Sequence, residues 1–387
     1  MANTVETGLF ASHPRNWQDN HYVYPVLSRR SNGLSIGINL NPDKICNFDC
    51  IYCQVDRTVP AEITEVDLPR LRQELDQMLR LAYGGELFDA PHFSATPPLV
   101  RRINDIAFSG DGEPTTFRQF DEVVRITADI KRKLLLEHVK IVVISNATQF
   151  HRDHVQRALS ILDDNNGEIW AKLDAGTDAY YHKIAVTSIP LQSILDNILL
   201  VARERPIVIQ SLFMRVDGVG PDRDEIEAYV KRIADLIESG GKIKLVQVYT
   251  VARPPAQSNV TALDNDDVDD IVRLVRRELG LRALPYYGLS TPQKEKRERQ
   301  ATKDVKREAD VATELNDERK VTTEEPAAAT DQGTGMADTG TVDTGTVDTG
   351  IADTGTVDTE RPASESQGDG SEETGDNNEN PVEWGER

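Results

Sequence analysis

The sequence of 387 residues contains only three cysteines, Cys46, Cys50 and Cys53, and all of them lie within eight residues of one another. A small, odd and clustered number of cysteines excludes a framework of several disulfides. It is instead typical of a thiolate site in a reducing compartment, so we expect a cytoplasmic protein.

Long apolar runs are also absent. No run approaches the 18 consecutive apolar residues of a membrane-spanning helix, and the first residues, Met-Ala-Asn-Thr-Val-Glu, lack a basic stretch followed by an apolar core. The sequence therefore predicts neither an export signal nor a membrane span, and no membrane partner.

Large apolar residues almost disappear from position 291 onward, so this region cannot bury enough surface to fold. Residues 321–387 contain 17 Asp or Glu and two Arg, a net charge of −15, which leaves −6 of the total −21 for the rest of the chain. We predict an N-terminal extension over 1–33, a folded unit over 34–290, and a disordered tail over 291–387 that is first charged and then an acidic low-complexity repeat.

Short apolar runs alternate with segments of helical spacing through the middle of the chain, which predicts parallel strands joined by helices. The expected strands are 34–40, 103–109, 139–145, 168–174, 207–215 and 243–250. The expected helices are 68–81, 117–135, 151–162, 191–202, 222–237 and 268–279. Six such units indicate an α/β fold, a partial (β/α)6 TIM-like barrel, whose chemistry should gather at the C-terminal ends of the strands.

The cysteine segment directly follows the first expected strand and should lie at that edge of the sheet. Three thiolates suit either zinc or an iron-sulfur cluster. A structural zinc ion needs a fourth ligand, and none of the seven histidines has a spacing that obviously completes such a site. A 4Fe-4S cluster tolerates three protein ligands when an outside molecule binds the fourth iron.

The pattern C-x3-C-x2-C with an aromatic residue, Tyr52, before the last cysteine resembles the radical S-adenosylmethionine superfamily. The resemblance implies two cofactors, S-adenosyl-L-methionine and a 4Fe-4S cluster held by Cys46, Cys50 and Cys53. In that superfamily, electron transfer to the sulfonium releases a 5′-deoxyadenosyl radical, which abstracts hydrogen from a substrate. Tyr52 would lie against the adenine, the alternative being a packed aromatic side chain.

The segment Ser109-Gly110-Asp111-Gly112-Glu113-Pro114 ends the second expected strand and resembles the glycine-glycine-glutamate motif of the same superfamily. By that resemblance Ser109, Gly110, Gly112 and Glu113 would bind the cofactor, with the carboxylate accepting from its amino group. Glycines allow a close backbone approach, and a carboxylate is a strong acceptor for an ammonium. The alternative is a turn with proline at a helix start.

Further polar residues end the later strands. By analogy with the superfamily, Asn146 and Asp174 would contact the carboxylate or ribose of S-adenosylmethionine, the alternative being helix caps or turn residues. Four more residues face either the substrate or the rim: Gln210, Arg215, Tyr249 and Arg253.

Within the superfamily, Asn-Pro-Asp-Lys before the cysteines and Lys-Leu-Asp-Ala at residues 172–175 resemble the branch of the wyosine-type tRNA-modifying synthases. The resemblance covers residues 34–255 and implies a nucleobase or nucleotide substrate. The chain has no cysteines for the second cluster of those synthases. Because no flavin motif is visible either, we expect an external electron donor of the flavodoxin or ferredoxin type.

Two alternatives use the same cysteines. An activase that makes a glycyl radical on a partner protein needs only one cluster. A non-catalytic iron-sulfur or zinc binding protein would bind metal without cleaving S-adenosylmethionine.

Overall fold

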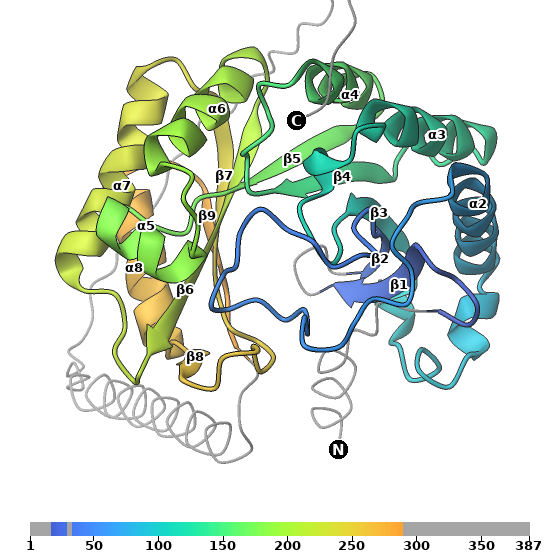
Figure 1. The fold of residues 1–387 in the computed structure, drawn as a ribbon, viewed down its shortest axis with the longest axis horizontal. Helices are drawn as coiled ribbons and strands as arrows, with labels where there is room; N and C mark the ends of the chain where they lie inside the picture. Colours follow the sequence, from blue (N-terminus) through green and yellow to red (C-terminus); the bar gives the residue numbers. More distant parts are fainter. Residues whose placement is uncertain (1–16, 29–32, 289–387) are drawn as a thin grey trace, which may run out of the picture. The chain divides into compact units, whose positions relative to one another are not determined.

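The structure is a computed structural model that describes residues 17–28 and 33–288. One curled sheet carries the fold, and the longer helices pack around its outer side (Figure 1). The strands are β1 (Val23–Ser28), β2 (Gly33–Ile38), β3 (Ile103–Phe108), β4 (Lys140–Ser145), β5 (Gly167–Lys172), β6 (Ile207–Val216), β7 (Ile243–Thr250), β8 (Val260–Ala262) and β9 (Ala283–Tyr286). The α-helices are α2 (Leu68–Gly84), α3 (Phe120–Lys133), α4 (Asp153–Asp163), α5 (Asp178–Ala185), α6 (Leu191–Glu204), α7 (Arg223–Glu238) and α8 (Asn265–Leu279).

The strands follow one another in space in the order β1-β2-β3-β4-β5-β6-β7-β9. All neighbours from β2 onward are parallel, and β1 pairs antiparallel with β2. Because successive strands are neighbours and the order never reverses, the helices stay on one side and the sheet curls like part of a barrel. The predicted α/β partial barrel is confirmed, while its predicted disordered tail lies outside the described residues.

The sheet contains three strands that the sequence did not predict. β1 lies inside the segment interpreted as an N-terminal extension, so the sheet begins earlier than expected. Pro25 interrupts its apolar pattern, which an edge strand tolerates. β9, with the sequence Ala-Leu-Pro-Tyr, is too short to show a period, and β8 pairs antiparallel with the end of β6.

Alternation along each strand separates a helix-facing side from an interior side. On β2, Leu34 and Ile36 are fully buried in the main core, whereas Ser35 lines an interior cavity. On β5, Ala171 joins the core and Lys172 lines the same cavity. The interior therefore receives polar side chains from β2 and β5, which positions them for chemistry.

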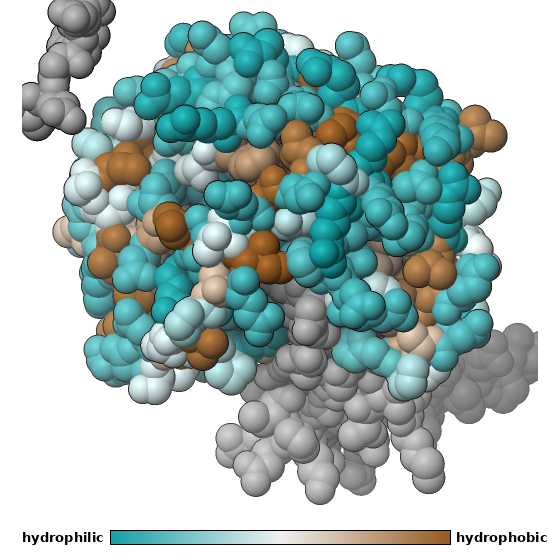
Figure 2. All heavy atoms as spheres, turned by 45° about the vertical axis from the view of Figure 1, so that its right-hand side comes forward, coloured by the Kyte–Doolittle hydropathy of each residue, from teal (hydrophilic) through white to brown (hydrophobic). Residues whose placement is uncertain are grey.

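Local sequence signals fix the helix ends. Asp67 caps α2 by accepting a hydrogen bond from the backbone N–H of Arg70, and Gly85, whose φ of 96° favours glycine, caps the C-terminal end of the helix. Asp222 caps α7 in the same way as Asp67 caps α2. Hydrophilic residues predominate on the face in Figure 2, as expected for amphipathic helices around a sheet. No helix among the described residues is long and apolar enough to cross a bilayer.

Candidate active site

A cavity of about 350 Å³ lies at the C-terminal ends of the parallel strands, within the range of about 300–1,000 Å³ found for small-molecule sites. It brings together nine of the ten residues that the sequence predicted for the site, namely Cys46, Cys50, Tyr52, Cys53, Ser109, Gly110, Gly112, Glu113 and Asn146. The tenth residue, Asp174, does not line the cavity but contacts two side chains that do.

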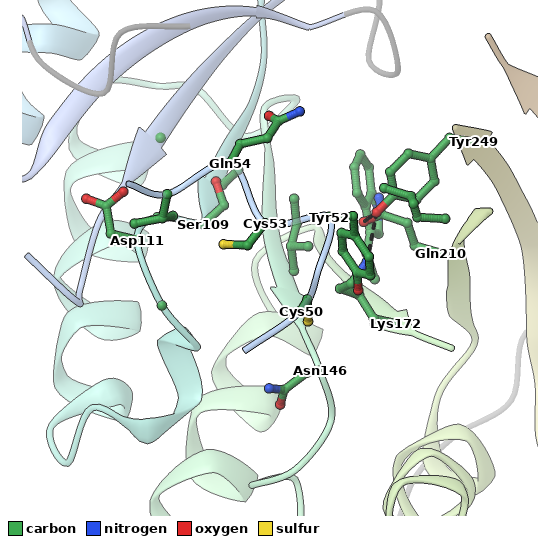
Figure 3. A pocket seen from close by; sticks show the side chains of 18 of the residues that line it. Cys50, Tyr52, Cys53, Gln54, Ser109, Asp111, Asn146, Lys172, Gln210 and Tyr249 are labelled. Atoms are coloured by element: carbon green, nitrogen blue, oxygen red, sulfur yellow. Dashed lines mark hydrogen bonds between the residues drawn. The ribbon is translucent and has the colours of Figure 1, made fainter. Parts of the chain in front are cut away.

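The three thiols are free and partly buried. They share the cavity, but among the described residues no three His, Cys, Asp or Glu side chains are gathered closely enough to hold a metal ion. Figure 3 shows the sulfur atoms of Cys50 and Cys53 pointing in different directions. A metal centre bound by all three thiols would therefore require at least some of these side chains to rotate.

The backbone of the cysteine segment is fixed to distant parts of the chain. The N–H of Ile51 donates to the carbonyl of Ile184 near the end of α5 at 2.9 Å. The carbonyl of Cys53 accepts from the N–H of Ala256, in the loop after β7, at 3.0 Å. These bonds hold the loop over the sheet edge while leaving its side chains facing the cavity.

Two basic residues on either side of the cysteines cross-link the loop. The Lys44 ammonium donates to the carbonyl oxygens of Asp56 and Val59, at 3.0 and 2.8 Å. The Arg57 guanidinium donates through Nε to the carbonyl oxygen of Lys44 at 3.0 Å. Its Nη1 donates to the Cys53 sulfur at 3.2 Å. The segments before and after the three cysteines are thereby joined.

Burial affects the protonation of two of the thiols, Cys46 and Cys50. It raises the pKa of Cys50 to about 12, although a hydrogen bond with Tyr52 and the nearby Lys172 charge act in the opposite direction. Burial also raises the pKa of Cys46. Both groups are therefore thiols at neutral pH, and a metal that binds them as thiolates must displace their protons.

The glycines after β3 let the turn approach the cysteine loop. A Cβ at Gly112 would lie 2.2 Å from the carbonyl oxygen of Ile45, the residue before Cys46. A Cβ at Gly110 would lie 2.2 Å from Oδ1 of Asn39. Only glycine allows this separation, so both positions set the contact between the two loops.

Glu113 is buried, with 3% of its surface exposed, and its carboxylate joins two strand ends. Oε1 accepts from the Ser145 hydroxyl at 2.7 Å and from the N–H and hydroxyl of Thr115, at 3.2 and 2.5 Å. Oε2 accepts from the N–H of Asn146 at 2.7 Å. Burial raises the pKa of Glu113, and the bonds from Thr115, Asn146 and Ser145 oppose this shift.

Asn146 reaches from the end of β4 to the cysteine loop. Its side-chain amide donates to Oδ1 of Asn47 at 2.8 Å, and its own Oδ1 accepts from the Thr148 hydroxyl at 2.7 Å. Asn47 in turn donates to that hydroxyl at 2.7 Å. Asn146 therefore supports the residue that follows Cys46.

A second group of polar side chains lies on the other side of the cysteines from Ser109 and Asp111 (Figure 3). The Tyr52 hydroxyl donates to Asp174 at 2.5 Å, and Lys172 forms an ion pair with Asp174 at 3.1 Å. Lys172 also donates to the Tyr249 hydroxyl at 2.8 Å, and its ammonium lies 5.1 and 5.3 Å from the ring centroids of Tyr52 and Tyr249. This network connects the cysteine loop to the ends of β5 and β7.

Lys172 remains a cation in this setting. Burial alone would lower its pKa, but the Asp174 carboxylate and the Tyr249 hydroxyl raise it above the ordinary value. A protonated lysine is a hydrogen-bond donor and an electrostatic partner rather than a nucleophile.

The residues that the sequence left ambiguous fall into two groups. Gln210, Tyr249 and Arg253 line the cavity. Arg215 does not line this cavity and instead bridges Asp264 and Asp267 at the start of α8, at 3.1 and 2.5 Å.

Sequence reasoning missed the contacts made by five residues. Lys172 ends β5 and Asp174 follows two positions later, inside the strand expected from the sequence, and this spacing could have suggested their pairing. Lys44, Asn47 and Arg57 lie in irregular loop, where no periodicity marks a contact.

No family model matches the chain. In sequence it is 29% identical over 140 residues to a UPF0026 protein of Helicobacter pylori strain J99, which corresponds to 36% of this chain and 39% of that protein. It is also 29% identical over 146 residues to a UPF0026 protein of Methanocaldococcus jannaschii, covering 36% of this chain and 37% of the relative. The matches thus span about two fifths of these curated relatives.

Solved structures that resemble the chain include radical S-adenosylmethionine enzymes. A radical SAM methyltransferase from Sphaerobacter thermophilus is 12% identical with a TM-score of 0.49, over 71% of this chain and 72% of that one. TYW1 with a lysine-pyruvate adduct bound is 16% identical with a TM-score of 0.41, over 71% and 81%. The chain is thus similar in sequence to UPF0026 proteins over part of their length.

Proposed function

We propose that this protein is a radical S-adenosylmethionine enzyme in which Cys46, Cys50 and Cys53 hold one 4Fe-4S cluster. The observation that carries the proposal is the shared cavity: the three thiols of a C-x3-C-x2-C segment line it together with the turn from Gly110 to Glu113. Three thiolates without a fourth protein ligand are the donor set of a cluster that leaves one iron open to another molecule. When bound, such a cluster supplies the electron that cleaves S-adenosylmethionine to a 5′-deoxyadenosyl radical.

The residues around the thiols have distinct tasks in this proposal. Each carboxylate oxygen has about two acceptor positions, and Oε2 of Glu113 uses one of them for Asn146. Its second position is available for the ammonium of S-adenosylmethionine. Asp174 acts indirectly, because it holds the Tyr52 hydroxyl and the Lys172 ammonium at the cavity wall.

The interior wall suits an aromatic substrate. Tyr52, Trp170 and Tyr249 line the cavity together with the amide of Gln210. Ring faces and a side-chain amide can stack on and hydrogen-bond a nucleobase, so we propose a nucleobase or nucleotide substrate. The described residues contain three cysteines only, hence the electron would come from an external donor of the flavodoxin or ferredoxin type.

The test is anaerobic reconstitution with iron and sulfide, followed by dithionite reduction and chromatography for 5′-deoxyadenosine after S-adenosylmethionine is added. Wild-type protein should form 5′-deoxyadenosine, and Cys50→Ala should not. A chain that loads a complete cluster yet never cleaves the cofactor would support the non-catalytic binding protein instead. Retention of zinc in place of iron would contradict the proposal at its first step.

A further inference from the structure

We propose that Arg57 sets the reduction potential of the metal centre through its hydrogen bond to the Cys53 sulfur, whereas Lys44 only closes the loop. This inference rests on the proposed function, since it concerns a cluster bound by the three cysteines. It assigns Arg57 as a positioning residue with an electrostatic effect.

The contacts of Arg57 divide its guanidinium between two tasks. Nε donates to the carbonyl oxygen of Lys44 at 3.0 Å, which orients the planar group. Nη1 then faces the Cys53 sulfur at 3.2 Å. A guanidinium can make both bonds at once because its donors form a rigid fork, which a lysine ammonium does not offer.

The carboxylate nearest to the Arg57 guanidinium neutralises its positive charge only weakly. The nearest ion-pair partner of Arg57 is Asp49, at 3.7 Å, and the Asp49 side chain is 75% exposed to solvent. The Arg57 side chain is 29% exposed and lines the cavity beside the thiols. Water screens the distant, exposed carboxylate more than the adjacent sulfur, so the positive charge acts mainly on Cys53.

A cation at a ligating sulfur favours the reduced state. Reduction brings one electron from the external donor, and therefore one more negative charge, to a centre already held by three thiolates; no bond or proton moves. Hydrogen bonds to the sulfurs and nearby charge are among the factors that set iron-sulfur potentials. Arg57 should therefore raise the potential and ease reduction by the donor.

Lys44 provides a matched control within the same loop. It carries the same charge as Arg57 and also cross-links the loop, but within the described residues its ammonium holds the carbonyl oxygens of Asp56 and Val59 and no sulfur. Comparing Arg57→Gln with Lys44→Gln therefore separates the sulfur contact from loop closure and from loss of charge.

The experiment is a potentiometric titration of the reconstituted wild type and both variants, followed by electron paramagnetic resonance. We expect Arg57→Gln to bind as much iron as the wild type and to show a more negative midpoint potential, and Lys44→Gln to show a smaller shift. Equal potentials in Arg57→Gln and the wild type, or equal shifts in both variants, would overturn the inference.

If Arg57→Gln loses iron, Arg57→Lys decides the question. The lysine ammonium does not extend as far as Nη1 and lacks the planar fork that holds Nη1 at the sulfur, so its midpoint potential should also lie below that of the wild type, and an unchanged potential overturns the inference. A wild-type chain that takes up no cluster would contradict the proposed function itself, a result distinct from either of these.

Discussion

The backbone N–H of Asn146, just after β4, donates a hydrogen bond to the Glu113 carboxylate beyond β3 at 2.7 Å. Neighbouring strand ends are thus joined by a buried carboxylate as well as by the sheet. The two bonded residues also face the cysteine loop, because both line the cavity. Stability at this edge and the shape of the site are therefore linked.

Replacing Glu113 with Gln should destabilise the fold. An amide group turns one acceptor into a donor, which then faces the N–H of Asn146 or the donors of Ser145 and Thr115 without a partner. We expect the free energy of unfolding to fall by about 1–3 kcal/mol. Thermal denaturation measures this, with the exposed Glu238→Gln as a control expected within about 0.5 kcal/mol. Equal melting temperatures for wild type and Glu113→Gln would show that the carboxylate is dispensable.

The same pair of proteins should also differ in its pH dependence. Burial raises the pKa of Glu113, so its carboxyl group is more readily protonated in the folded chain than in the unfolded chain. Its contribution to stability is full below the ordinary glutamate pKa of about 4.3 and is lost as pH rises through the folded pKa. The stability advantage of the wild type over Glu113→Gln should therefore shrink as pH rises above about 4.3. Chemical denaturation at several pH values measures the difference, and an advantage that grows with pH would contradict the sign.

The fold could be predicted where the chain repeats a strong pattern. The six strands from β2 to β7 and the longer helices between them show apolar alternation or helical spacing long enough to be recognised. The eight-residue helix α5 was not predicted. β1 could not be predicted because Pro25 breaks its pattern. β9 could not be predicted because four residues carry no period.

The site was predictable through residue types at strand ends, but its contacts were not. The spacing of Cys46, Cys50 and Cys53 indicates a metal site, and the glycines before Glu113 indicate a binding turn. The bond between Arg57 and the Cys53 sulfur depends on how an irregular loop folds back on itself. Such a path is set by tertiary contacts that no short stretch of sequence contains.

Gly112→Ala should impair metal binding by the cysteine loop. Its Cβ would lie 2.2 Å from the carbonyl oxygen of Ile45, so the backbone immediately before Cys46 must move. We expect the iron content after reconstitution to fall by roughly half or more, because Cys46, the first of the three ligands, would be displaced by roughly 1 Å. Iron and sulfide assays measure this.

Gly220→Ala is the matched control for that substitution. Its Cβ would meet only the end of the Leu263 side chain, at 3.3 Å, which can give way. Its iron content should equal that of the wild type. Full iron loading of Gly112→Ala would show that the loop can shift without losing its ligands.

The ion pair between Lys172 and Asp174 should behave as a buried pair in a double-mutant cycle. The charged atoms are 3.1 Å apart, and the side chains are 18% and 11% exposed. Lys172→Met leaves the carboxylate without its cation, so we expect a loss of about 3–5 kcal/mol in the free energy of unfolding. Adding Asp174→Asn removes the uncompensated charge, while its side-chain oxygen can still accept from the N–H of Leu212, a bond of 2.8 Å in the wild type. The double variant should therefore lose less free energy of unfolding than the sum of the losses of the two single variants, as measured by urea denaturation.

The exposed pair of Lys231 and Asp235 is the control, and its coupling energy should be no more than about 1 kcal/mol. Strictly additive losses at Lys172 and Asp174 would mean that water screens this pair as effectively as the exposed one, and the wall of the cavity would then be wet rather than closed.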